Sequence, residues 1–252
     1  MLRKNKVSVL VTAKNEEKQI AACLKTLDFA DEIILILDSC TDKTEMISKK
    51  FTNQIFKDSF AQEGERRNYG ISKCNYDWIF EIDADERVTK ELQNEILITI
   101  TKSTFNYHQI PVNNYIGKKL IKYGWGAYFG KSAYIGLFKK GSKIWGEQRV
   151  HPRILLKGKK GDKLKNPIKH YYCKDISDMF TKLNKYSDAR CNDIISMRIK
   201  ENLRMNLRRV ISRFWKCFIL RKGYREGRYG FLIALIASLY PILSFLKSEF
   251  KK

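Results

Sequence analysis

Short apolar runs alternate with amphipathic segments over the first ninety residues of the chain. Each run is rich in valine, isoleucine and leucine with few polar positions, which is typical of a strand buried on both faces. Between the runs, apolar residues recur every three or four positions, which predicts helices. The predicted strands are residues 7–12, 32–37, 54–56 and 78–82, and the predicted helices are residues 20–27, 44–51 and 65–74. Strands that alternate with helices predict a parallel sheet covered on both faces, and ligands of such sheets bind at the carboxyl ends of the strands.

Three carboxylates follow the fourth predicted strand within four residues: Asp83, Asp85 and Glu86. Carboxylates this close repel one another at neutral pH, so a shared cation would offset the cost of folding them together. A hard divalent ion such as Mg²⁺ or Mn²⁺ prefers oxygen ligands and keeps positions open for substrate phosphates. A solvated acidic turn is the alternative for an isolated Asp-x-Asp pattern. Glu86 is better placed to hold the loop in shape than to act as a third ligand.

Polar residues follow two other predicted strands as well. Asn15 and Glu16 come after the first strand, and Asp38 and Asp42 come after the second. Because the carboxyl ends of parallel strands meet at one edge of a sheet, these residues are expected to lie beside the Asp83 cluster. A nucleotide is the expected ligand, with a carboxylate on its base or ribose and a metal ion on its diphosphate. The chain has neither a Gly-x-Gly-x-x-Gly nor a Walker motif, which argues against a Rossmann dehydrogenase and a P-loop NTPase.

Four ordered motifs resemble the nucleotide-sugar domain of inverting family 2 glycosyltransferases. They are VSVLVTAKNEE at 7–17, DEIILILDSCTDKT at 31–44, GERRNYG at 64–70 and DWIFEIDADERV at 77–88. Within that family, they are most similar to small bacterial lipopolysaccharide-core enzymes of the β-glucosyltransferase type. The resemblance implies an α/β, GT-A-like nucleotide-sugar-binding fold with a mainly parallel central sheet. The loop at 38–44 is one residue shorter than is usual in the family, which leaves the role of Asp42 open.

The resemblance also implies roles for residues of these motifs. The residues implied to lie along the nucleotide are Thr12, Ala13, Asn15, Glu16 and Asp38. Asp83 and Asp85 form the metal motif, in which Asp85 coordinates the ion and Asp83 reaches the ribose or the sugar. Arg67 is the expected cation on the donor side, and a surface arginine in a charged helix is the alternative. The implied ligands are a divalent metal ion, Mn²⁺ or Mg²⁺, and a nucleotide sugar such as a UDP-sugar.

Few acids in the second part of the chain could act as a general base. From residue 102 to residue 174 the only acids are Glu147 and Asp162. An inverting transfer needs a base to take the proton of the acceptor hydroxyl, so Glu147 is the first candidate. His151 is the second candidate, as the base itself, a third metal ligand or a structural residue. Similar enzymes often have an acid directly after this histidine, where the chain has Pro152.

Aromatic residues next to glycines also mark this part of the chain. Trp125 and Trp145 lie in such segments, where they either stack on sugar rings or anchor the core. His170 is a further histidine, which either closes over the donor phosphates or packs inside the fold.

Basic residues are concentrated in the second part of the chain. Residues 1–100 have 15 basic and 18 acidic side chains, residues 101–252 have 34 and 9, and the net charge is +22. Such a charge attracts polyanions, namely nucleic acid, anionic lipid or phosphorylated glycans. Nucleic acid is the least favoured of the three, because the sequence has no motif that reads bases. Six scattered cysteines without the spacing of a zinc site indicate a reducing, cytosolic compartment.

The last third of the chain is predicted to be helical. Residues 175–193 have helix-start residues and one apolar face, and residues 204–228 have the pattern of a basic amphipathic helix. Residues 231–246 contain no charge but are interrupted by Pro241, and sixteen residues are fewer than the roughly 20 needed to span a bilayer. The pattern favours a pair of interfacial or half-inserted helices. A buried helical hairpin or a dimer contact is the alternative.

The expected organisation is a GT-A-like domain at 1–174, with a donor half at 1–100 and an acceptor half at 101–174, and a helical, membrane-associated extension at 175–252. The leading hypothesis is a metal-dependent transferase that moves a sugar from a nucleotide diphosphate to a lipid-linked or lipopolysaccharide-core glycan. It is expected in the cytoplasm, peripheral to the cytoplasmic face of the inner membrane, where the basic arm meets anionic lipid. The alternative is a non-catalytic module that binds membrane or nucleic acid on an inactive transferase fold. The sequence predicts no oligomeric state.

Overall fold

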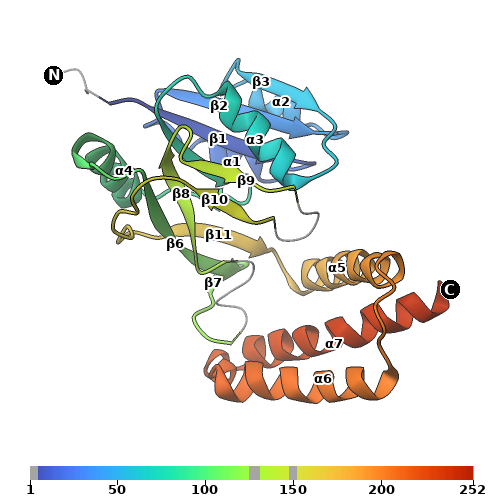
Figure 1. Cartoon of the computed structure of the whole chain (residues 1–252). Coiled ribbons are helices and arrows are strands. Elements are labelled where there is room, and N and C mark those ends of the chain that lie inside the picture. The colour runs from blue at the N-terminus through green and yellow to red at the C-terminus, as the bar shows by residue number, and fades with distance from the viewer. Residues whose placement is uncertain (1–4, 125–130, 148–151, 252) are drawn as a thin grey trace. The chain divides into compact units, whose positions relative to one another are not determined.

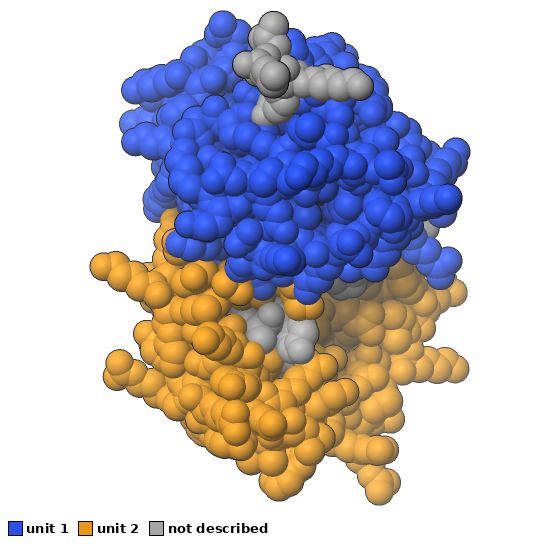
Figure 2. All heavy atoms as spheres, turned by 90° about the vertical axis from the view of Figure 1, so that its left-hand side faces the viewer, with its two compact units in different colours: residues 1–112, 133–170 blue, residues 113–132, 171–252 orange. Residues whose placement is uncertain are grey.

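The structure consists of two compact units, which Figure 2 shows in different colours. The computed structural model describes residues 5–124, 131–147 and 152–251. The first unit comprises residues 1–112 and 133–170, and the second comprises residues 113–132 and 171–252. The predicted domain boundary at residue 174 stays a prediction, although residues 113–132 group here with the C-terminal residues.

Four parallel strands form one half of the sheet, in the order β3-β2-β1-β4. They are β1 (Val7–Ala13), β2 (Glu32–Asp38), β3 (Ile55–Asp58) and β4 (Trp78–Asp83). All seven residues of β1 are buried, as expected for a central strand with helices on both faces. The four predicted strands are therefore confirmed, with ends shifted by at most two residues.

The other half of the sheet is antiparallel. Strand β8 (Ala133–Lys139) pairs with β4, and β6 (Tyr107–Ile116) pairs with β8. The order continues with β11 (Ile168–Cys173) and β5 (Glu86–Arg87), while β7 (Lys119–Leu120) also pairs with β6. A separate two-stranded sheet consists of β9 (Lys143–Trp145) and β10 (Ile154–Leu156). The observed sheet is thus parallel over its first four strands, as predicted, and mixed as a whole.

Helices cover both faces of the parallel strands (Figure 1). The helices of the first unit are α1 (Ile20–Leu24), α2 (Thr44–Ser48), α3 (Glu63–Lys73) and α4 (Lys90–Lys102). α1 and α4 pack with Val9 and Phe80 in one core, and α3 packs with Leu10 and Ile79 in a second core. Two cores form because successive side chains of β1 and β4 point to opposite faces of the sheet.

Two glycines let α3 pack closely against its neighbours. A Cβ on Gly70 would lie 2.5 Å from Leu10 Cδ1, and a Cβ on Gly64 would lie 2.0 Å from the carbonyl oxygen of Gly146. A larger side chain at Gly64 would meet backbone, which cannot move aside as a flexible side chain can. Both glycines belong to the third sequence motif, so part of that motif serves the close packing of α3.

The C-terminal part of the second unit is helical (Figure 1). Its elements are α5 (Ile176–Ser196), α6 (Leu203–Trp215), the π-helical turn η2 (Lys216–Leu220), the 3-10 turn η3 (Gly223–Glu226) and α7 (Arg228–Phe250). The helix predicted at 175–193 is present. In the segment 204–228, which has the pattern of a basic amphipathic helix, the α-helix extends only to Trp215 and the turns η2 and η3 follow. The chain turns back at Gly227, whose φ is +58°. A Cβ on Gly230 would lie 1.8 Å from the carbonyl oxygen of Gly223, so glycines allow η3 to approach α7.

α7 is a continuous helix of 23 residues that contains Pro241. The uncharged segment 231–246 lies within this helix, and the expected interruption at Pro241 is wrong. Pro241 has no N–H to donate to the preceding turn, but it is buried in a helix that packs against α5 and α6. By length and composition α7 could cross a membrane, a test that core helices of soluble proteins also pass, and 39% of its most apolar stretch is buried in the structure.

Candidate active site

The carboxyl ends of β1, β2 and β4 lie side by side at one edge of the sheet. Thr12 near the end of β1 is opposite Asp83 of β4 on one side and Ile36 of β2 on the other. Asp38 is the last residue of β2, two positions beyond Ile36. The structure therefore brings together the three strand ends that were predicted to meet.

Hydrogen bonds tie the loop after β1 to the loop after β2. Asn15 Oδ1 accepts a hydrogen bond from Thr41 N at 2.8 Å, and Glu16 N donates to Thr44 Oγ1 at 2.8 Å. Asp42 Oδ2 accepts a hydrogen bond from Glu17 N at 3.0 Å, and Asp42 Oδ1 accepts one from Thr44 N at 3.0 Å. Asp42 thus connects the two loops, which gives the shortened loop a structural role.

Two residues of these loops have strained backbone. Asn15 and Ser39 have φ angles of 56° and 48°. Residues other than glycine rarely adopt this left-handed conformation, and it is found preferentially at binding sites. Both positions lie at the edge of the sheet where the nucleotide was predicted.

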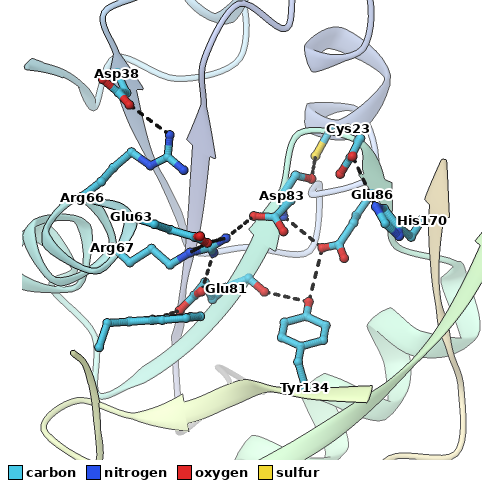
Figure 3. Close-up of polar contacts among 12 residues, drawn as sticks. Cys23, Asp38, Glu63, Arg66, Arg67, Glu81, Asp83, Glu86, Tyr134 and His170 are labelled. Atoms are coloured by element: carbon cyan, nitrogen blue, oxygen red, sulfur yellow. Dashed lines mark hydrogen bonds and ion pairs between the residues drawn. The ribbon is translucent and has the colours of Figure 1, made fainter. Parts of the chain in front are cut away.

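Asp38 is a buried carboxylate with two cations beside it (Figure 3 shows its pair with Arg66). Its Oδ2 lies 3.4 Å from Lys14 Nζ and 3.3 Å from Arg66 Nη1, and its Oδ1 accepts hydrogen bonds from Phe60 N and Ser39 Oγ. Burial alone would raise the pKa of Asp38. The two hydrogen bonds, and then the two cations, outweigh burial and lower this pKa below its usual value. Asp38 is therefore ionised at neutral pH and can accept hydrogen bonds from a ligand.

Arg67 is the centre of a buried ion cluster next to the carboxylates (Figure 3). Its guanidinium donates to Glu81 Oε1 at 2.5 Å, to Asp83 Oδ1 at 2.9 Å and to Glu63 Oε1 at 2.8 Å. Only 7% of Arg67 is exposed, so the alternative of a surface arginine is wrong. Burial alone would lower the pKa of Arg67, but the charges of Asp83 and Glu81 raise it well above its usual value. Arg67 thus stays charged and holds Asp83 in place.

Glu81 and Lys143 complete the cluster, and the sequence reasoning did not identify them. Glu81 Oε2 accepts hydrogen bonds from Lys143 Nζ at 2.9 Å and from Trp145 Nε1 at 3.2 Å, and Lys143 Nζ also donates to Ile135 O at 2.8 Å. Burial would raise the pKa of Glu81, but Lys143 and Arg67 lower it. A glutamate inside an otherwise apolar strand is the signal that could have revealed the cluster, because a buried carboxylate needs a cation nearby.

Asp85 lies beside His170, which comes from the distant strand β11. Asp85 Oδ2 and His170 Nε2 are 3.3 Å apart. His170 is opposite Glu86 in the antiparallel pairing of β11 with β5, which fixes its place next to the carboxylates. The side chain of Asp85 is 23% exposed, so solvent and ligands can reach it. The structure therefore places His170 on the aspartate that was predicted to bind the metal.

Glu86 is buried under the loop that carries the two aspartates (Figure 3). Its Oε2 accepts a hydrogen bond from Asp83 N at 3.0 Å and one from Tyr134 OH at 3.4 Å. Tyr134 OH also lies 2.9 Å from the carbonyl oxygen of Glu81. Glu86 thus holds the loop in shape, as predicted.

These motifs and this sheet agree with a known protein family. The family model described as Glycosyl transferase family 2 matches residues 8–174. The chain belongs to glycosyl transferase family 2. The prediction that it is a glycosyltransferase is thereby confirmed.

Family 2 relatives match almost the whole chain. An uncharacterized glycosyltransferase of Rickettsia conorii, RC0292, is 24% identical over 96% of this chain and 89% of its own length. The lipopolysaccharide core biosynthesis glycosyltransferase LpsC of Rhizobium meliloti is 23% identical over 98% of this chain and 93% of its own. Among solved structures, S. aureus TarS 1–349 is similar with a TM-score of 0.51 and 13% identity, covering 92% of this chain and 90% of that chain. This last similarity concerns the fold, which is GT-A-like as predicted.

The predicted general base of this family 2 enzyme lies at the edge of the described structure. Glu147 is exposed and lies two residues beyond β9. The ring of Trp145 in β9 packs on Arg67, with the guanidinium carbon 4.8 Å from the ring centroid. Trp145 thus packs against the buried ion cluster, which agrees better with a core anchor than with a residue that stacks on sugar rings. Trp125 and His151 lie outside the described residues.

Metal-binding side chains are few in this family 2 site. Within the described residues, no group of three or more histidine, cysteine, aspartate or glutamate side chains could hold a metal ion. Asp83 and Asp85 fit a smaller site, because Mg²⁺ is commonly bound by one or two carboxylates together with substrate phosphates and water. The predicted nucleotide contacts, which stay predictions, are those of Thr12, Ala13, Asn15, Glu16 and Asp38.

Proposed function

We propose that the chain is a metal-dependent, inverting glycosyltransferase that moves a sugar from a nucleotide-diphosphate donor, such as a UDP-sugar, to a lipid-linked or lipopolysaccharide-core glycan. The observation that carries the proposal is the position of Asp83 and Asp85. Asp83 ends β4 and Asp85 lies in the turn that follows, at the edge of the sheet where β1 and the Asp38 end of β2 also terminate. Three strand ends with carboxylates at one edge suit a nucleotide whose diphosphate binds a cation.

The base and ribose of the donor would lie along the loops after β1 and β2. Asp38 is ionised and buried, so it suits a hydrogen bond from a base N–H. Thr12 and Ala13 lie at the carboxyl end of β1, between β2 and β4, which is the edge of the sheet where a nucleoside would bind. Asn15 and Glu16 belong to a loop that is already held by the second loop, so little conformational entropy would be lost on binding.

Asp85 and Asp83 are the residues that would hold the metal ion. Their side chains are 23% and 28% exposed, whereas their partners His170 and Arg67 are buried. Buried partners orient both carboxylates before a ligand arrives. When bound, a divalent cation would neutralise the charge that develops on the diphosphate leaving group.

Glu147 is the proposed general base, and His151 is the second candidate. The base takes the proton of the acceptor hydroxyl while the hydroxyl oxygen forms its bond to the anomeric carbon. The bond from that carbon to the diphosphate breaks on the opposite side, and the nucleoside diphosphate leaves. Glu147 is supported by its exposure and by its position two residues after Trp145, which packs on the Arg67 cluster.

A lipid-linked acceptor is supported by the relative LpsC and by the charge of the chain. LpsC is named for lipopolysaccharide core biosynthesis and matches 98% of this chain. The 34 basic and 9 acidic residues after position 100 suit an acceptor at an anionic surface, and they support a proposed location at the cytoplasmic face of the inner membrane. The family match favours this enzyme over a non-catalytic membrane or nucleic-acid module.

Replacement of Asp85 tests the function. The purified chain with Mn²⁺ is assayed for hydrolysis of, and transfer from, a panel of nucleotide sugars. We expect Asp85→Ala to lower turnover about 100-fold or more, because a metal ion contributes several kcal/mol to such a transition state. The control is Asp77→Ala, since Asp77 is an exposed acid just before β4. No turnover of any nucleotide sugar by the wild type, or equal turnover by Asp85→Ala, would overturn the proposal.

A further inference from the structure

α6 has a continuous row of large apolar side chains on its exposed face. The row consists of Leu203, Leu207, Ile211 and Trp215, which are 50%, 48%, 72% and 58% exposed. Residues four apart lie on the same side of an α-helix, so the four side chains are neighbours along the helix. Leu220, in the turn after α6, is 65% exposed and lines the same shallow depression as Ile211 and Trp215. We call these five side chains the apolar row.

A second row, on α6 and the first residue of η2, is basic. Arg204, Arg208 and Lys216 are exposed and each follows a member of the apolar row by one position. Residues 203–228 contain nine basic residues, and their only acid is Glu226. Glu226 is buried and forms an ion pair with Lys119 at 3.1 Å, so it does not offset the charge of the exposed helix face.

The other side of α6 packs against α7. Asn206 is buried, and the ring of Phe214 lies 5.7 Å from that of Phe231 in α7. α7 in turn packs against α5, where Lys247 forms an ion pair with Asp188 at 3.0 Å, so α7 lies between the two other helices (Figure 1). The apolar side chains of α7 thus have protein neighbours on two sides, whereas the apolar row of α6 faces away from α7.

We propose that α6 lies flat in the headgroup region of an anionic lipid bilayer, with the apolar row inserted and the basic row on lipid phosphates. An exposed apolar stripe beside arginines and lysines, with a tryptophan, is the pattern of an interfacial helix. A second copy of the chain does not suit this face, because pairing two such faces would bring like charges together. The inference deepens the membrane association in the proposed function and rests on it, and it identifies α6 rather than α7 as the lipid-binding helix.

Vesicle binding tests the apolar row. The full chain is sedimented with vesicles of phosphatidylcholine and phosphatidylglycerol. We expect Ile211→Asp to weaken binding about tenfold or more, because the variant removes one inserted apolar side chain and adds a charge. The matched control is Ile98→Asp, since Ile98 is an exposed apolar residue on a helix of the first unit and should leave binding unchanged.

Three further variants separate insertion from simple attraction. Arg208→Gln and Lys216→Gln should each weaken binding about fivefold on anionic vesicles and have little effect on vesicles of phosphatidylcholine alone. Tryptophan emission of the wild type should shift to the blue with vesicles, and Trp215→Phe should remove this shift although three other tryptophans remain.

Three results would overturn the inference. They are unchanged vesicle binding by Ile211→Asp with a melting temperature equal to that of the wild type, no vesicle binding by the wild type, and a dimer in solution that Ile211→Asp dissociates. The activity assay keeps this failure apart from a failure of the proposed function. Asp85→Ala should bind vesicles like the wild type, and Ile211→Asp should retain turnover of the soluble nucleotide sugar.

Discussion

Asp83 and Asp85 are separated by one residue, yet their side chains have different neighbours. Asp83 accepts a hydrogen bond from Arg67, whereas Asp85 lies beside His170. The sequence predicts this pair of aspartates and its place, because an apolar run ends in acids. It does not predict the neighbours, since Arg67 reaches Asp83 only when α3 packs on the sheet, and His170 reaches Asp85 only when β11 pairs with β5.

Arg66 and Arg67 are adjacent in α3 but are expected to have separate roles. Arg67→Ala would leave the buried Glu81 and the half-buried Asp83 without their shared cation, and removing one partner of a buried ion pair costs about 3–5 kcal/mol. We expect urea unfolding to show a loss of stability of that order. Arg66→Ala leaves this cluster intact, and Asp38 keeps Lys14 and its hydrogen bonds, so we expect a smaller loss of stability together with weaker UDP binding, because Arg66 contacts Asp38.

Urea denaturation and titration of UDP in the presence of Mn²⁺ measure the two effects separately, and each variant is the control of the other. Wild-type stability of Arg67→Ala would contradict the energetic role of the buried cluster. Wild-type UDP affinity of Arg66→Ala would contradict its place beside the nucleotide.

At the scale of elements, the parallel strands could be predicted and the ends of the C-terminal helices could not. Strands β1 to β4 are apolar runs that end in polar residues, and such runs need no distant partner to be recognised. The turn from η3 into α7 brings Gly223 close to Gly230, and these two residues are seven positions apart and meet only in the folded chain. Pro241 is similar, because helices packed against α7 decide whether the helix continues past it.

Glu32 shows how one buried carboxylate joins several elements of the first unit. At the start of β2 it accepts hydrogen bonds from Ser8 Oγ of β1, and from Asn75 N at 2.6 Å and Asn75 Nδ2 at 2.7 Å in the turn before β4. Burial would raise the pKa of Glu32, but the hydrogen bonds from Ser8 and Asn75 lower it below the usual 4.5. A carboxyl whose pKa is lowered on folding stabilises the fold above its unfolded pKa, and this contribution is lost as the pH falls through the folded pKa.

We therefore expect Glu32→Gln to lower stability by about 1–3 kcal/mol near neutral pH, because the amide cannot accept all these hydrogen bonds. The difference from the wild type should shrink as the pH falls below 4.5. Urea unfolding over a range of pH measures this difference in stability, and Asp162→Asn, at an exposed position, is the control. A difference that grows on acidification would contradict the ionised, hydrogen-bonded state of Glu32.

At the scale of the whole molecule, the acids and the bases have different distributions. The carboxylates proposed to bind the nucleotide and the metal ion all lie in the first hundred residues, which have a small net negative charge, and 34 basic residues follow. The sequence predicts this asymmetry directly, because charge can be counted without a structure. The structure adds the place of the basic and apolar rows, which share the exposed side of α6.

Salt dependence separates the partners that this charge could attract. Binding to nucleic acid arises mainly from counterion release and falls steeply as the salt concentration rises. Binding to anionic vesicles through the apolar row has, in addition, a hydrophobic part that salt does not screen. We therefore expect NaCl to release the chain fully from a DNA duplex while a part of it stays on vesicles that contain phosphatidylglycerol.

The Ile211→Asp variant is the matched control, because it weakens the hydrophobic part and changes the net charge by one unit only. This variant should dissociate from vesicles and from DNA over the same range of NaCl concentration. Sedimentation with vesicles and filter binding with DNA, in one series of salt concentrations, measure both. A wild-type chain that leaves vesicles as readily as DNA would mean that charge alone attracts it to the membrane, because an inserted apolar row has to retain some protein after the charges are screened.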